Sequence, residues 1–180
     1  MLSDNRIENH TARIPAALAG WLAYVAVDFL THAVFLAPWW RATEAYWLPP
    51  AGLVARIPFG YGAFAIYVAG VMWLVVRIIG PRPQPARAIR FGAVTGLVFG
   101  SASGLANYSV FAMPTSAILV WPASVTIASV AAVAAGVSTL HADRPWRQVL
   151  NVLLGALALV VAGVVLQNLF FPTPSDRLLR

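Results

Sequence analysis

Five apolar stretches, each long enough to cross a lipid bilayer as a helix, determine what this chain can fold into. A transmembrane helix needs about 20 consecutive, mostly apolar residues, and in hydrocarbon a helix satisfies its own backbone hydrogen bonds. The sequence therefore predicts an all-α fold, an integral membrane bundle that forms one domain over residues 1–180. The five predicted transmembrane helices span residues 14–36, 57–79, 91–112, 117–140 and 149–171.

The composition agrees with a lipid environment and excludes several classes of protein. Of the 180 residues, 60% are hydrophobic and only 10% are charged, whereas a soluble domain carries about 25% charged residues. The absence of cysteine excludes disulfides and thiolate metal sites. The net charge of +6 comes from arginines beside the apolar stretches, so we expect membrane lipids as partners and no nucleic acid.

The arginines also predict the origin and orientation of the chain. All 12 basic residues are arginine, a bias typical of GC-rich bacterial genomes. Positive charge gathers on the cytoplasmic side of membrane proteins, and we therefore expect a bacterial inner-membrane protein with a cytoplasmic N-terminus. Four arginines fall on the opposite side, and eight fall on the N-terminal side: Arg6, Arg13, Arg77, Arg82, Arg87, Arg90, Arg144 and Arg147.

The connection between the first two predicted helices is rich in aromatic residues. Trp39 and Tyr46 are seven residues apart, as are Trp40 and Trp47, so in a helix these rings would share one face. This spacing predicts a short helix that lies in the outer membrane interface. An irregular aromatic loop is the alternative.

The third predicted helix carries glycines at every fourth position. Small residues at this spacing let another helix backbone approach closely, which strengthens packing in a membrane. The preferred partner is the 117–140 helix of the same chain, where Ala128, Ala132 and Gly136 have the same spacing. A second copy of the chain or another protein is the alternative partner. The four glycines are Gly92, Gly96, Gly100 and Gly104.

Asp28 and His32 form the main candidate site. They are four residues apart and so share a helix face, and Asp28 lies roughly 21 Å into its span. A carboxylate near the bilayer centre costs about 2.5–3.5 kcal/mol, so we expect it to face a polar partner inside the bundle. Residues at a similar predicted depth, which we expect to complete an outer polar cluster, are Arg56, Tyr61, Asn107, Tyr108, Ser124, Gln167 and Asn168.

Four interpretations of the Asp28 and His32 pair remain open at this stage. The pair could titrate as a proton or ion site, could bind a small amphipathic or cationic ligand, or could hold a metal or tetrapyrrole through His32. It could also serve only to fix helix packing by an internal hydrogen bond. One histidine and one aspartate are few ligands for a metal, which needs three or four, so no metal site is predicted.

Known catalytic motifs are absent from the sequence. It has no nucleophile elbow, no phosphate-binding glycine loop and no paired carboxylates, so we expect no catalytic residues. The first functional hypothesis is a non-enzymatic accessory or structural membrane subunit. The second is a small transporter, or a ligand- or ion-binding membrane protein, that uses the outer polar cluster.

The chain resembles small, uncharacterised bacterial multi-pass membrane proteins. The likeness rests on Asp28 and His32 in the first span, on Asn107 and Tyr108 after the glycine-rich stretch, and on Trp121 in the fourth span. It implies a membrane fold and no known activity.

A shorter stretch is similar to bacterial light-harvesting β-polypeptides. His32 is followed by Trp39, Trp40 and Arg41, in the histidine, aromatic and arginine order of those proteins, where the histidine ligates bacteriochlorophyll. The likeness covers under a dozen residues and lacks the small residue four positions before the histidine. It implies a third function, binding of haem or bacteriochlorophyll at His32.

Overall fold

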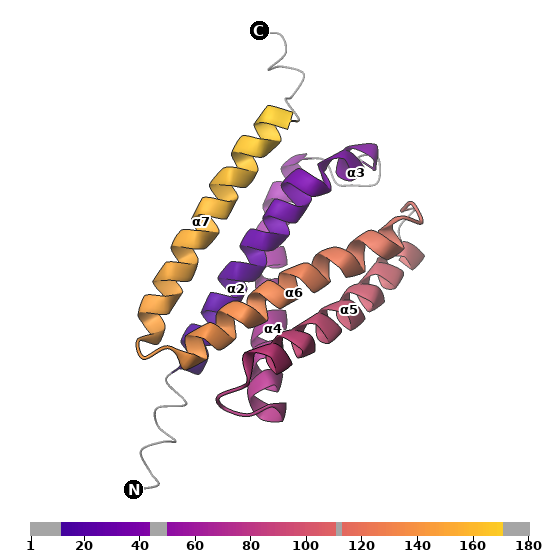
Figure 1. Ribbon diagram of the computed structural model, residues 1–180. Coiled ribbons are helices and arrows are strands. Elements are labelled where there is room, and N and C mark those ends of the chain that lie inside the picture. The colour runs from indigo at the N-terminus through magenta and orange to yellow at the C-terminus, as the bar shows by residue number, and fades with distance from the viewer. Residues whose placement is uncertain (1–11, 44–49, 111–112, 171–180) are drawn as a thin grey trace, which may run out of the picture.

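The computed structural model describes residues 12–43, 50–110 and 113–170, and these residues are helical with short connections and no strand (Figure 1). The first span is α2 (Arg13–Leu30) continued by a π-helical turn, η1 (Thr31–Phe35), and the short helix α3 (Ala37–Ala42) follows. The remaining helices are α4 (Pro50–Ile78), α5 (Pro85–Val110), α6 (Ala117–His141) and α7 (Pro145–Phe170).

Five helices in the described part of the chain are long and apolar enough to cross a membrane, which confirms the predicted all-α, multi-pass fold. Their ends differ from the predicted spans by up to four residues, except that α4 begins at Pro50 rather than at residue 57 and α5 at Pro85 rather than at residue 91. Pro58, predicted near the start of its helix, therefore lies inside α4. The segment predicted as an interfacial helix is helical from Ala37 to Ala42, and Tyr46 and Trp47 lie outside the described residues.

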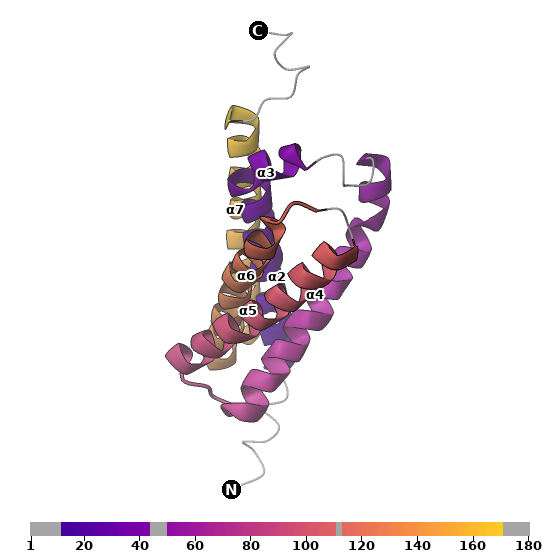
Figure 2. The same ribbon diagram turned by 90° about the vertical axis from the view of Figure 1, so that its right-hand side faces the viewer.

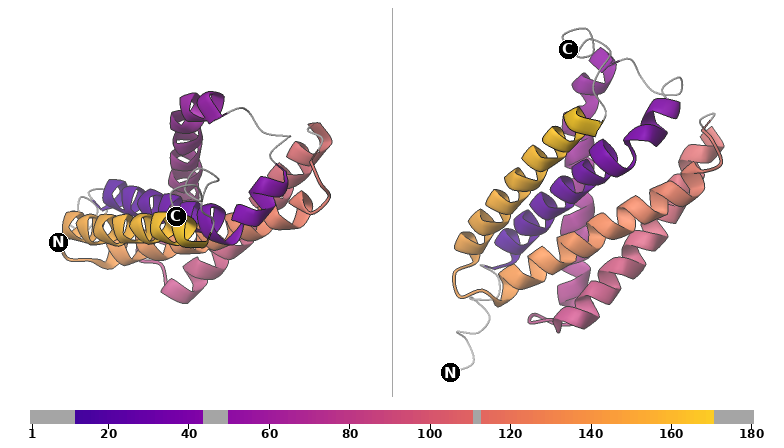
Figure 3. Two further views of the ribbon diagram at one scale, coloured as in Figure 1. Left: turned by 90° about the horizontal axis from the view of Figure 1, so that it is seen from above. Right: turned by 45° about the horizontal axis from the view of Figure 1, so that its top comes forward.

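Helix α2 lies at the centre of the bundle and packs against α4, α6 and α7, while α5 packs mainly against α6 (Figures 1 and 3). The start of α2 and the α4–α5 and α6–α7 connections lie together at what we call the N-terminal end of the bundle. The opposite, C-terminal end holds η1, α3, the α5–α6 connection and the end of α7 (Figure 2).

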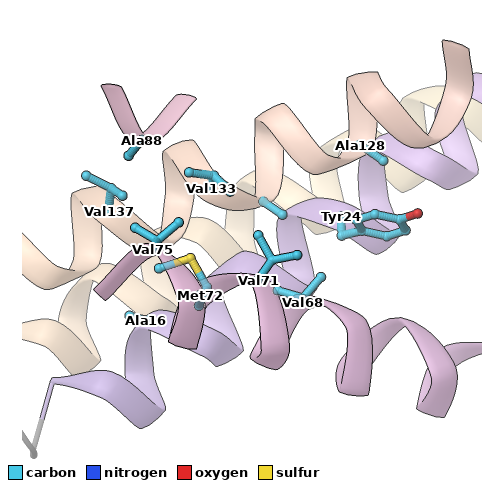
Figure 4. Close-up of a cluster of buried hydrophobic side chains, with 11 residues drawn as sticks. Ala16, Tyr24, Val68, Val71, Met72, Val75, Ala88, Ala128, Val133 and Val137 are labelled. Carbon is cyan, nitrogen blue, oxygen red and sulfur yellow. The ribbon is translucent and has the colours of Figure 1, made fainter. Parts of the chain in front are cut away.

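Residues from α2, α4 and α6, with Ala88 of α5, form the core, and small side chains bring α2 and α6 close together. Tyr24, Val68 and Val133 are almost completely buried in this cluster (Figure 4). A Cβ atom on Gly20 would lie 3.0 Å from the backbone oxygen of Ala132. Such close approach replaces the hydrophobic driving force that helices lack in lipid.

The predicted glycines of α5 form one surface, the glycine face (Gly92, Gly96, Gly100 and Gly104), and it packs against α6 of the same chain. The contact residues on α6 differ from the expected ones. The glycine face meets Trp121, Pro122, Val125, Thr126, Ser129 and Val133. Ala132 and Gly136 lie instead against α2 and α4, because α6 carries small residues on two faces and the spacing alone does not tell these faces apart.

Gly100 provides a direct test of the contact between α5 and α6. A Cβ atom at Gly100 would lie 2.7 Å from the Cα of Pro122, a backbone atom that cannot rotate away. We expect Gly100→Ala to destabilise the purified protein by about 1–3 kcal/mol, a typical cost of overpacking. We expect the larger side chain of Gly100→Leu to prevent α5 from assembling against α6. The measurement is the unfolding midpoint in detergent.

Gly155→Ala is the matched control for this substitution. Gly155 also lies inside a helix, but no atom lies within 4 Å of the Cβ that alanine would add there. We expect this variant to be as stable as the original protein or slightly more so, since alanine favours helix. Equal effects of the two substitutions would contradict the close packing of α5 on α6.

Candidate functional site

The candidate site begins where the first span changes from an α-helix to a π-helical turn. The backbone N–H of Leu36 donates to the carbonyl of Thr31, five residues earlier, at 2.9 Å. Pro38 gives the physical reason, because it has no N–H to donate and its ring would clash with the carbonyl four residues before it. The helix therefore widens over Thr31–Phe35 and ends, and α3 starts at Ala37.

Three side chains are joined across this junction in what we call the Asp28–His32–Trp40 chain. The Nε2 atom of His32 lies 3.3 Å from Oδ1 of Asp28. On the other side of the ring, the indole N–H of Trp40 donates to Nδ1 of His32 at 2.8 Å. An indole can only donate a hydrogen bond, so Nδ1 carries no proton. A neutral His32 therefore holds its proton on Nε2, the nitrogen that faces the carboxyl group of Asp28.

Aromatic contacts hold α3 beside the Asp28–His32–Trp40 chain. The ring centroids of Trp40 and Trp39 are 5.1 Å apart, and those of Trp40 and Trp121 are 6.2 Å apart. The indole N–H of Trp39 donates to the hydroxyl of Ser116 at 2.8 Å. Because Ser116 immediately precedes α6, these contacts tie α3 to the start of α6 and hold Trp40 in position.

An open pocket of about 350 Å³ lies beside His32 at the C-terminal end of the bundle. Its volume falls in the range of small-molecule sites. His32 and Asp28 keep 25% and 17% of their side-chain surface exposed, and His32 lies in the wall of the pocket while Asp28 does not. The pocket is lined by Phe29, His32, Ala33, Ala37, Trp40, Arg41 and Gln167.

The structure brings together only part of the predicted polar cluster. Asp28 and His32 contact each other, and Gln167 on α7 lines the same pocket. Arg56 is exposed on α4 and makes no described ion pair with Asp28, whose carboxylate contacts His32 instead. The backbone oxygen of Tyr61 accepts a hydrogen bond from Trp21 at 3.1 Å. Trp21 lies about two turns before Asp28, so Tyr61 lies away from the pocket, toward the N-terminal end of the bundle.

The other predicted members of the cluster also lie outside the pocket lining. Asn107 and Tyr108 sit near the end of α5, and 39% of the Tyr108 side chain is exposed. The hydroxyl of Ser124 donates to the carbonyl of Trp121 in its own helix. The prediction used depth along each helix, and α5 lies against α6 rather than beside α2, so equal depth does not place these residues together.

Trp40 and Phe29 were not among the predicted site residues. The sequence placed Trp40 at the membrane interface as an anchor, and the π-helical turn brings its indole back onto His32. Pro38 was the available signal, because a proline disfavours continuation of the helix through the turn before it. Nothing in the spacing of the aromatic residues indicated which of them would return to the histidine.

Metal binding through His32 would disrupt this arrangement. Both ring nitrogens already have partners, so axial ligation of a tetrapyrrole would require His32 to leave either Asp28 or Trp40. No group of three histidine, cysteine or acidic side chains suited to a metal occurs among the residues that the structure places.

The bond between Trp40 and His32 can be tested through the nitrogen-15 chemical shift of Nδ1. Trp40→Phe removes the donor to Nδ1, while Asp28 still lies beside Nε2 and favours the proton there. We expect the Nδ1 signal of histidine-labelled protein to move to the position of a nitrogen without a hydrogen bond, and the His32→Gln variant assigns the signal. Trp39→Phe is the control, because Trp39 donates to Ser116 and not to His32. An unchanged Nδ1 shift in Trp40→Phe would show that Trp40 does not donate to His32.

No protein-family model matches the sequence, and no curated protein or solved structure is detectably similar to it. The resemblance to small bacterial multi-pass proteins therefore stays a prediction, and the functional argument rests on the geometry of the pocket.

Proposed function

We propose that this non-enzymatic, multi-pass membrane protein binds a small ligand in the pocket at the C-terminal end of its bundle. One observation carries the proposal: the Asp28–His32–Trp40 chain borders an open pocket of about 350 Å³ instead of being enclosed between helices. Buried polar groups that only fix packing satisfy one another away from solvent. Here the ring of His32 forms part of a wall that a ligand can reach.

The lining of the pocket favours a particular kind of ligand. Phe29 and Trp40 offer aromatic surface, and Gln167 offers an amide that both donates and accepts. Arg41 brings a guanidinium group to the lining and also interacts with other groups of the protein, whereas the carboxylate of Asp28 is directed to His32. This charge distribution supports an aromatic or amphipathic molecule with an anionic group, rather than the cationic ligand that Asp28 alone suggested.

The proposed orientation places this pocket on the outer side of a bacterial inner membrane. Asp143 is the one acidic residue among the described residues at the N-terminal end of the bundle, and Arg41 and Arg56 are the described arginines toward the other end. The positive-inside rule supports a cytoplasmic N-terminal end. The described arginines at that end are Arg13, Arg77, Arg82, Arg87, Arg90, Arg144 and Arg147.

The predicted role as an accessory or structural subunit would need a different surface from the one the sequence suggested. The glycine face already packs against α6, so a partner protein or a second copy that used this face would have to displace α6. The free energy needed to break the contact between α5 and α6 favours ligand binding over a subunit role that uses the glycine face.

Two probes of similar size and opposite charge, benzoate and benzylamine, test the proposed ligand class. We expect benzoate to raise the unfolding temperature of the purified protein and benzylamine to have little effect, because Arg41 lines the pocket. In Arg41→Gln the stabilisation by benzoate should disappear. Arg56→Gln is the matched control, since Arg56 is exposed on α4 and is not part of the lining. Equal responses to the two probes, or equal losses in the two variants, would contradict an anion-selective pocket.

Asp28→Asn separates a binding role from a structural one. The amide keeps the size of the carboxyl group and can still accept from Nε2 of His32, but it has no charge. Because Asp28 lies behind His32 and does not line the pocket, its negative charge can only repel an anion bound there. We expect binding of benzoate to strengthen about fivefold, as expected for about 1 kcal/mol of charge repulsion, while the unfolding temperature of the ligand-free protein changes little. A large loss of stability with unchanged binding of benzoate would show that the pair serves packing alone.

A further inference from the structure

A narrow apolar groove at the N-terminal end of the bundle lies between α2, α4 and α6, far from the ligand pocket. Its accessible volume is about 90 Å³, well below the roughly 300 Å³ of a small-molecule site. Apart from Arg13, its walls are apolar. The groove is lined by Arg13, Ala16, Ala17, Ala69, Met72, Trp73, Val76 and Leu140.

The position of these residues along their helices places the groove at one membrane surface. Arg13 begins α2, and Ala17 lies one turn further along that helix. On α4, Ala69 lies about 13 Å from the helix end at Ile78, given the rise of 1.5 Å per residue. The groove therefore runs from the charged end of the bundle about two turns into the hydrocarbon region.

Two features indicate what can occupy a groove of this shape. Its width and apolar walls suit a flexible hydrocarbon chain, because Ala17 and Ala69 leave room where larger side chains would close it. The guanidinium of Arg13 stands at its charged end, and Arg77 follows the groove residue Trp73 by one turn on α4. Arginine binds phosphate through paired hydrogen bonds. A hydrocarbon chain below an anionic phosphate is the chemistry of a phospholipid, and an acidic phospholipid is favoured beside arginine because it has no cationic headgroup to offset the charge of the phosphate.

We propose that this groove binds one acyl chain of an anionic phospholipid whose phosphate contacts Arg13. Trp73, with 62% of its side chain exposed, borders the groove and provides a flat surface for the acyl chain. The site is independent of the ligand pocket. A general attraction of lipid to the arginines at this end would need no single residue. The proposed site requires both the charge of Arg13 and an open apolar groove.

Native mass spectrometry of the full chain in mild detergent tests this site with two lipids that share the same acyl chains, phosphatidylglycerol and phosphatidylcholine. We expect the protein to retain one phosphatidylglycerol in preference to phosphatidylcholine. Arg13→Gln should weaken retention of phosphatidylglycerol about fivefold, the effect expected of one basic residue at a membrane surface. Retention of phosphatidylcholine should fall less, because its quaternary ammonium group offsets the charge of the phosphate that Arg13 contacts.

Ala69→Phe tests the groove itself, because the ring would occupy the space of the acyl chain. We expect it to reduce retention of both lipids. Ile66→Phe is the matched control, since Ile66 lies one turn away on α4, is 78% exposed and does not line the groove. Arg90→Gln is the control for charge, because Arg90 lies near the same end on α5 and outside the lining.

The proposal fails if the original protein retains the two lipids equally, or if Arg90→Gln weakens phosphatidylglycerol as much as Arg13→Gln does. The second result would show a diffuse basic surface rather than a site. Equal retention by Ala69→Phe and Ile66→Phe would likewise exclude the groove. The unfolding temperature of each variant shows that it is folded, and the Arg13→Gln and Arg90→Gln comparison decides the question if Ala69→Phe does not fold.

Discussion

The bundle depends on direct approach of helix backbones to the two faces of α6. Helices in lipid gain little from burying apolar side chains, because the surrounding hydrocarbon is equally apolar, and close packing through small residues takes over that role. On one face of α6 the glycine face of α5 leaves no room for side chains, and on the other Gly20 lies against the backbone of Ala132. Helix α6 thereby joins α5 to the group formed by α2, α4 and α7.

The packing of α2 against α4 and α6 explains why Asp28 and His32 lie together toward the end of the first span. The core around Tyr24 and Val68 fills the space between α2, α4 and α6, which leaves Asp28 and His32 beyond the core, near η1. There α3, which follows η1 directly, supplies a polar partner. Trp40 hydrogen bonds His32 and also packs against Trp121. The position of the site thus follows from where the packed core ends.

The sequence predicted the five helices and the contact of the glycines with α6, because both follow from apolar length and from spacing along one helix. It also predicted that Asp28 and His32 would meet, since residues four apart share a face. It did not predict the members of the site that come from other helices. Asn107 and Arg56 lie at a suitable depth, but depth does not specify which helices are neighbours or how they are turned. The pairing of Trp40 with His32 depends on the break at Pro38, whose geometry no periodic pattern describes.

The π-helical turn at Thr31–Phe35 has a consequence for how this chain can vary. Such a turn accommodates one residue more than an α-helical turn would, and each residue of an α-helix rotates the chain by about 100°. Loss of a single residue between Leu30 and Leu36 would therefore swing α3 about a quarter of the way around the helix axis and carry Trp40 away from His32. We therefore expect the number of residues in this segment to matter more for the site than their identity. An insertion or deletion there would alter the pocket more than many of the substitutions that leave the length unchanged.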